Sequence, residues 1–152
     1  MVAVCIDAPA FIYTLSAPSA TGGAWEGTGI NAVTGEFDPA TAGAGTQMIK
    51  YQSKTTGCYT RDSVNIVVKP RMDATINPNS LTFCPGDVAT NATAVDGGGT
   101  WTGWLATATT ADNVVTFNPT AEGKDSLVYT IADDANVCGD VDTLRVIVTV
   151  AD

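Results

Sequence analysis

Histidine is absent from this 152-residue sequence. Its absence removes the commonest general base, the commonest transition-metal ligand, and every Ser-His-Asp or Cys-His catalytic arrangement. Basic residues are also scarce, because 7 Lys and Arg stand against 16 Asp and Glu, which gives a formal net charge of −9. A nucleic-acid partner is therefore not expected, since binding a phosphate backbone needs a basic face.

Long apolar runs are absent as well. No apolar stretch reaches the roughly 18 residues of a membrane span, so no membrane insertion is expected. No window carries the i, i+3, i+4, i+7 apolar stripe of an amphipathic helix. The start of the chain, residues 1–5, lacks the basic and apolar regions of a signal peptide. Hydrophobic residues nevertheless make up 45% of the sequence, which excludes disorder as the main state.

The residues that are abundant are those that favour β-strands. We count 23 Thr and 16 Val, whose branched side chains suit a pleated sheet better than a helix. Fifteen Gly and seven Pro interrupt the chain at short intervals, as turns between short strands do. The composition therefore predicts an all-β fold, and the length allows one or two domains.

One internal repeat runs through the chain. Gly22–Gly27 matches Gly98–Gly103, with Trp25 and Trp101 at equivalent positions. Other matches follow in the same order at offsets of up to 80 residues: Cys5 with Cys84, Phe37-Asp38-Pro39 with Phe117-Asn118-Pro119, Ile49-Lys50-Tyr51 with Leu127-Val128-Tyr129, Cys58 with Cys138, and Asp62–Val68 with Asp142–Val148. The repeat predicts two modules, 1–70 and 71–152, joined by a short, proline-stiffened seam. The opening strand of the first module is expected to be shortened.

The second module carries the clearer strand pattern. Alternation at 126–131 places Leu127, Tyr129 and Ile131 on one face, and Trp101 is expected to point into the core. The predicted strands are 75–76, 81–83, 89–95, 99–103, 114–117, 126–131 and 143–150. Six or seven short strands in about 80 residues are typical of an antiparallel β-sandwich.

Four cysteines allow three pairings. The repeat favours one pair within each module, Cys5–Cys58 and Cys84–Cys138, because their sequence separations are nearly equal. Four free buried thiols remain the alternative. A zinc site is less favoured, since no two cysteines have the spacing of a zinc motif. Disulfides would place the protein in an oxidising compartment, which is the periplasm, the cell surface or the medium.

The motifs together resemble a known family. Cys84-Pro85-Gly86-Asp87, Gly98–Trp101, Phe117-Asn118-Pro119, Leu127–Thr130 and Cys138 are similar to the tandem immunoglobulin-like repeats of very large Bacteroidetes cell-surface proteins, including gliding-motility adhesins and related type IX-secreted proteins. The resemblance implies two tandem immunoglobulin-like β-sandwiches that form a non-catalytic stalk or filament segment displayed outside the cell. Its partners would be neighbouring repeats of the same chain.

Two features could carry binding. Asp133, Asp134 and Asp140 cluster around Cys138, and calcium takes such oxygen ligands, although no EF-hand spacing is present. A solvated acidic loop explains the same residues without a cation. Trp104 has no counterpart in the first module and is the candidate for an exposed aromatic that contacts surface glycans or other surface proteins. A binding module, or a spacer of a secreted polysaccharide-degrading enzyme, therefore remains an alternative function.

Overall fold

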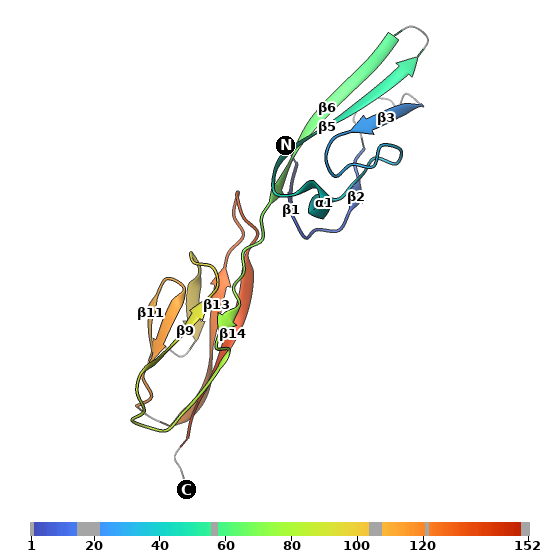
Figure 1. Ribbon diagram of the computed structural model, residues 1–152. Coiled ribbons are helices and arrows are strands. Elements are labelled where there is room, and N and C mark those ends of the chain that lie inside the picture. Colours follow the sequence, from blue (N-terminus) through green and yellow to red (C-terminus); the bar gives the residue numbers. More distant parts are fainter. Residues whose placement is uncertain (1, 15–21, 56–57, 104–107, 121, 150–152) are drawn as a thin grey trace. The chain divides into compact units, whose positions relative to one another are not determined.

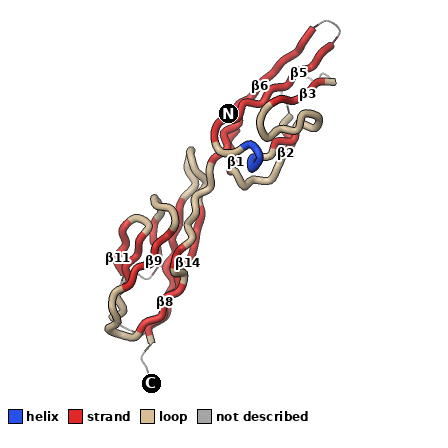
Figure 2. Tube along the Cα trace, in the orientation of Figure 1, coloured by secondary structure: helices blue, strands red, loops and turns tan. Residues whose placement is uncertain are grey.

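A computed structural model describes residues 2–14, 22–55, 58–103, 108–120 and 122–149. The chain divides into two compact units, Met1–Arg71 and Met72–Asp152. Strands dominate the described part of both units, as Figure 2 shows, and the all-β prediction is confirmed.

Unit 1 contains one four-stranded sheet and one short strand pair (Figure 1). The four-stranded sheet has the order β1-β6-β5-β3, and β2 pairs with β4. The elements are β1 Val2–Cys5, β2 Phe11–Ile12, β3 Gly23–Glu26, β4 Glu36–Phe37, α1 Pro39–Ala42, β5 Gly45–Thr55 and β6 Cys58–Lys69. Phe37, Ile49, Ile66 and Val68 form its small buried core.

Helix α1 of unit 1 was not predicted from the sequence pattern. Asp38 caps it by accepting hydrogen bonds from the Ala40 N–H and the Thr41 hydroxyl, and Pro39 occupies its first turn, where proline is favoured. Gly43 ends the helix with a φ of 77°. A single turn is too short to show an apolar periodicity, so only the Asp-Pro pair signals it.

Unit 2 contains two four-stranded sheets, with the orders β10-β13-β14-β8 and β11-β12-β9-β7. Buried side chains from both sheets form one cluster, so the sheets pack face to face. The strands are β7 Ile76–Asn77, β8 Ser80–Phe83, β9 Thr90–Ala94, β10 Thr100–Gly103, β11 Ala108–Ala111, β12 Val114–Phe117, β13 Gly123–Ile131 and β14 Asp140–Val148. Phe83 and Phe117 stack across the core with their ring centroids 5.4 Å apart.

The long hairpin β13–β14 contributes six side chains to this core. Leu127, Tyr129 and Ile131 are buried on one face of β13, as their alternation predicts. Leu144, Val146 and Val148 alternate in the same way on β14. Beside them Trp101 is only 8% exposed, so the prediction that it points into the core is confirmed.

The strand direction corrects one expectation. In each unit a four-residue strand near the start, here called the opening strand (β1 and β8), pairs in parallel with the closing strand (β6 and β14), whereas an antiparallel sandwich was predicted. In unit 2 the shorter β7 comes before β8 and pairs antiparallel with β9. Val2 to Cys5 of β1 lie beside Ile66 to Lys69 of β6, and Ser80 to Phe83 of β8 lie beside Arg145 to Val148 of β14. The side-chain alternation is the same in both pairings, so the sequence pattern cannot distinguish them.

The repeated Gly-x-Trp-x-Gly motif has the same structural role in both units. Trp25 lies across from Tyr51, with ring centroids 5.0 Å apart, and Trp101 lies across from Tyr129 at 4.7 Å. The first glycine of each motif makes room for the tyrosine ring, since a Cβ on Gly99 would meet Tyr129 Cζ at 2.5 Å. The last glycines, 27 and 103, have positive φ angles and no room for a side chain.

Candidate functional site

The predicted calcium ligands lie in the segment that links β13 to β14 and at the start of β14. Asp133 Oδ1 accepts a hydrogen bond from the Gly139 N–H at 2.7 Å. Asp134 Oδ1 accepts from the N–H groups of Asn136 and Val137, at 2.6 and 2.8 Å, which is an Asx-type turn. These two carboxylates therefore hold the loop in its own conformation.

The next two carboxylates hold the chain that enters unit 2. Asp140 Oδ2 accepts a hydrogen bond from the Ala74 N–H at 3.2 Å, and Asp142 Oδ2 accepts from the Ile76 N–H at 2.8 Å. Both lie on β14, and the N–H groups of two alternate residues of the entering segment donate to them. They fasten this segment to the closing strand where no regular ladder pairs the two.

Asp73 takes part in the same arrangement. Its backbone N–H donates to Asp96 Oδ2 at 2.9 Å, and its own Oδ1 accepts from the Thr75 N–H at 2.9 Å. The Thr75 hydroxyl and then the Thr75 N–H lower the pKa of Asp73, against desolvation and the charge of Asp140. The carboxylate is therefore held ionised by local hydrogen bonds.

This acidic cluster is thus explained by backbone hydrogen bonding, which uses at least one oxygen of every carboxylate described above. Calcium binding at Asp133, Asp134 and Asp140 stays a prediction, and a cation there would have to share these oxygens or use the remaining ones. The sequence reasoning did not predict that Asp142 and Asp73 accept hydrogen bonds from the backbone. The sequence feature that could have indicated this role is the position of Asp140 and Asp142, two residues apart at the start of a strand.

The predicted disulfide Cys5–Cys58 is wrong, and the strand register of unit 1 gives the reason. Cys5 lies beside Lys69, the last residue of β6, while Cys58 is the first residue of β6 and pairs with Thr55. At about 3.3 Å per residue the two ends of β6 are roughly 36 Å apart. A disulfide needs Cα atoms within about 7 Å of one another.

The predicted disulfide Cys84–Cys138 is wrong for the same reason. Cys84 follows Phe83, which lies beside Val148 at the end of β14, whereas Cys138 precedes Asp140 at the start of that strand. The length of β14 separates them by roughly 27 Å. Cys84 is a free, exposed thiol, and Cys138 is buried and disulfide-bonded.

Cys5 and Cys138 are both disulfide-bonded. Cys5 lies beside Lys69 in unit 1, and in unit 2 the Cys138 carbonyl accepts a hydrogen bond from the Met72 N–H at 2.9 Å.

The predicted aromatic contact residue, Trp104, lies outside the described residues. The two equivalent tryptophans serve packing. Trp101 packs on Tyr129 and donates its indole N–H to the Asp112 carbonyl at 2.9 Å, and half-buried Trp25 packs on Tyr13 and Tyr51. Packing against neighbouring aromatic rings is therefore the observed role of both side chains.

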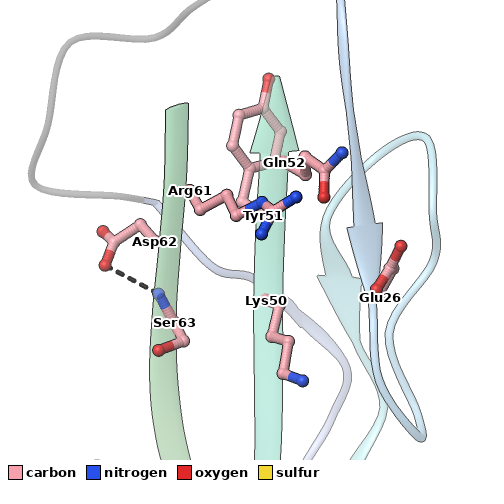
Figure 3. A pocket seen from close by; sticks show the side chains of 7 residues that line it. All are labelled: Glu26, Lys50, Tyr51, Gln52, Arg61, Asp62 and Ser63. Atoms are coloured by element: carbon pink, nitrogen blue, oxygen red, sulfur yellow. Dashed lines mark hydrogen bonds between the residues drawn. The ribbon is translucent and has the colours of Figure 1, made fainter. Parts of the chain in front are cut away.

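An open hollow of about 510 Å³ lies against β3, β5 and β6 of unit 1 (Figure 3). It is lined by Glu26, Lys50, Tyr51, Gln52, Arg61, Asp62 and Ser63. Its two acids do not form a catalytic pair. Glu26 lies across from Lys50, whose partner on β6 is Ser63, so the neighbouring Asp62 points to the other face of the sheet. The Asp62 carboxylate accepts from the Ser63 N–H, as the dashed line in Figure 3 marks. This hollow is a solvated sheet face of mixed charge.

Two further findings concern the chain as a whole. Among the described residues, no helix has the length and apolar character that crossing a membrane requires. No protein-family model matches the sequence, and no curated protein matches it.

Solved structures give weak likenesses. The crystal structure of the S-layer protein rSbsC(31-844) aligns with a TM-score of 0.36 and 15% identity, over 85% of this chain and 20% of that one. The crystal structure of S-layer protein SbsC domains 4 and 5 aligns with a TM-score of 0.36 and 18% identity, over 93% and 80%. The chain thus spans about a fifth of the first of these proteins. Likeness this low carries no inference about function.

Proposed function

We propose that this chain is a non-catalytic, load-bearing segment of tandem immunoglobulin-like repeats, part of the stalk or filament of a large bacterial cell-surface adhesin that serves surface attachment or gliding motility. The observation that carries this proposal is the parallel pairing of the opening and closing strands in both units.

The strand order of unit 2 supports the immunoglobulin-like assignment. With β7 to β14 named A, A′, B, C, D, E, F and G, the two sheets read D-E-B-A and C-F-G-A′. Immunoglobulin sandwiches distribute their strands between two sheets in this way. The sheet β1-β6-β5-β3 of unit 1 has the corresponding order A′-G-F-C, and β2–β4 takes the place of B and E.

The parallel pair gives each unit a mechanical clamp. A chain pulled from its ends draws the opening strand backward and the closing strand forward, along their own axes. Inter-strand hydrogen bonds run across the strands, so this load acts on all the hydrogen bonds of the pair at the same time. Peeling would instead break them one after another. Each clamp is four residue pairs long, and in unit 2 the clamp residues Val146 and Val148 are buried in the core.

The disulfide supports an extracellular location. A disulfide persists in oxidising surroundings and is rare in the cytosol of mesophiles. The carboxylates of the acidic cluster accept hydrogen bonds from the backbone, as described above. An adhesin stalk needs such structural roles and no catalytic centre.

Single-molecule pulling tests the proposal. The chain is held by its two termini in reducing solution, so that no disulfide limits the length of chain that is released. We expect two unfolding events, each releasing about 230 Å of chain at roughly 3.4 Å per residue. The same molecule pulled between the Cys84 side chain and the C-terminus loads β8 and β14 from one end, so unit 2 should yield at a clearly lower force.

The Cys84 handle is attached as a thioether before reduction, in a Cys58→Ser background that leaves one free thiol for it. Equal forces in the two pulling directions would overturn the load-bearing role, because a clamp must resist shear more than peeling. Unfolding without two resolved events under end-to-end load would do the same.

A further inference from the structure

The two units differ in the strand that comes before the opening strand. In unit 2 the chain first forms β7, which pairs with β9, and then forms β8, which pairs with β14. In unit 1 the strand β1 takes the place of β8, and β2 takes the place of β9. Among the described residues, β2 pairs with β4 alone, and no strand takes the place of β7. The comparison therefore defines a place for one more strand in unit 1.

Residues 72–77 show what this place holds in unit 2. Ala74 and Ile76 of this segment are buried in the core. The Ile76 N–H donates to Asp142 Oδ2 on β14 at 2.8 Å, while Ile76 itself pairs with Ala94 on β9. The segment thus adds apolar side chains to the core and is bonded to strands of both sheets.

Asp62 of unit 1 has the geometry of Asp142, but one of its oxygens has no donor. Asp62 lies across from Tyr51, as Asp142 lies across from Tyr129. In both aspartates Oδ1 accepts a hydrogen bond from the N–H of the next residue at 2.7 Å. Oδ2 of Asp142 accepts from Ile76, whereas Oδ2 of Asp62 has no partner among the described residues. Asp62 therefore presents an open acceptor where unit 2 holds a strand.

Ser53 gives a second, independent observation on the same side of the sheet. Ile49, Tyr51 and Ser53 alternate along β5, and Ile49 and Ser53 are fully buried. The Ser53 hydroxyl has no hydrogen-bond partner in the described part of the chain. Ser53 lies across from Thr60, two residues before Asp62, so Ser53 and Asp62 are diagonal neighbours. Because a buried hydroxyl without a partner is costly, this pair of polar groups points to a segment that offers backbone groups to both.

The aromatic pair of unit 1 is also less covered than its counterpart. Trp101 is only 8% exposed and Tyr129 is fully buried, whereas Trp25 and Tyr51 are half-buried. Tyr51 and Asp62 both line the open hollow of about 510 Å³ (Figure 3). The place thus combines ring surface with an anionic acceptor.

We propose that unit 1 is an acceptor for one more strand, an extended segment joined to the N-terminal side of β1. One of its residues donates its N–H to Asp62 Oδ2 and turns an apolar side chain into the core. The segment has the pattern of residues 72–77, in which apolar and polar residues alternate. Continuity with β1 is argued from unit 2, where only Pro78 and Asn79 separate β7 from β8. This inference rests on the proposed function, in which another repeat precedes unit 1.

A grafted chain tests the proposal. Val2 lies beside Ile66, and Leu81 lies beside Val146, the repeat equivalent of Ile66. A copy of residues 72–80 in place of Met1, followed by the rest of the full chain, therefore reproduces the spacing of β7 and β8. We expect hydrogen exchange of the β5 and β6 amides to slow at least about tenfold, or about 1.4 kcal/mol, with β13 and β14 unchanged.

Two variants show whether the grafted segment occupies the proposed place. The matched control carries Ile76→Asp in the graft alone, which keeps the length but cannot be buried, and should return the exchange rates to those of the ungrafted chain. Asp62→Ala should speed exchange of β5 and β6 at least about fivefold more in the grafted chain than in the ungrafted one. Only the grafted chain offers an N–H to that carboxylate.

Three results would overturn the proposal. The first is a graft that slows exchange no more than its Ile76→Asp control, and the second is a slowing that Asp62→Ala leaves unchanged. The third is an ungrafted chain that sediments as a dimer and loses protection of β5 and β6 on dilution, because a second copy would then fill the place. The pulling experiment uses the chain without the graft, so the acceptor site and the load-bearing role can fail separately.

Discussion

The hydroxyl of Tyr129 provides the sharpest test of how unit 2 is held together. Its ring is fully buried against Trp101. The hydroxyl accepts a hydrogen bond from the Gly99 N–H at 2.9 Å and donates one to the Asp96 carbonyl at 3.1 Å. Tyr129→Phe keeps the ring and its packing but removes both hydrogen bonds, which tie the segment before β10 to β13.

The expected cost follows from these two contacts. A hydrogen bond contributes about 1 kcal/mol net, and a polar group left buried without a partner costs about 1–3 kcal/mol. Gly99 and Asp96 are only half-buried, so water partly replaces the lost hydroxyl. We therefore expect a loss of about 2 kcal/mol in the free energy of unfolding of unit 2, which is about a 30-fold change in its opening equilibrium.

Hydrogen exchange with mass spectrometry reads this change unit by unit. The amides of β13 and β14 should exchange about 30-fold faster in the variant, and those of β5 and β6 should be unchanged. Tyr13→Phe in unit 1 is the matched control, because the Tyr13 hydroxyl forms no hydrogen bond with another described residue, while its ring packs on Trp25. A change below about threefold in β13–β14, or an equal change in both units, would refute the reasoning.

Four further outcomes are expected. Asp73 has a pKa below its ordinary 3.8, so its contribution to stability is present above pH 3.8 and is lost as the pH falls through the lowered value. Asp73→Asn should therefore weaken the acid dependence of unit 2 in pH-jump unfolding. Leu144→Ala removes a fully buried side chain and should cost unit 2 about 2–5 kcal/mol by denaturant titration. Iodoacetamide should label Cys84 without prior reduction, and failure to do so would contradict its free state. Calcium at about 1 mM should raise the melting temperature of the wild type but not of Asp133→Asn, if the predicted site binds; an equal shift in both would exclude that site.

The sequence predicted the strands of unit 2 closely where alternation was strong. Predicted strands at 81–83, 114–117 and 126–131 lie within β8, β12 and β13, because each places large apolar residues on one face. Strand β11 is not among the strands that the sequence pattern predicts. It pairs with β12 through a two-residue turn at Asp112 and Asn113, where Asp112 has a φ of 50°. Asp-Asn between two short strands is a hairpin signal that composition alone does not use.

The acidic loop shows a different limit. The sequence alone correctly predicted a cluster of carboxylates, but it did not predict which groups these carboxylates bind. Asp133 and Asp134 accept backbone N–H groups within their own loop, whereas Asp140 and Asp142 accept N–H groups from residues 66 positions earlier. The first kind can be foreseen, because Asx turns are local. The second depends on which strand lies beside the entering segment, and that is set by the sheet.

The cysteine pairing failed because equal spacing within a repeat does not fix the register of the strands. Equal separations of Cys5 from Cys58 and of Cys84 from Cys138 are what two equivalent bridges require. However, β1 lies beside the last four residues of β6, whereas Cys58 is the first residue of that strand. Even an antiparallel β1 over the same residues would leave Cys5 beside Ile66, roughly 26 Å from Cys58. The register along the closing strand therefore decides whether the two cysteines of one repeat can meet.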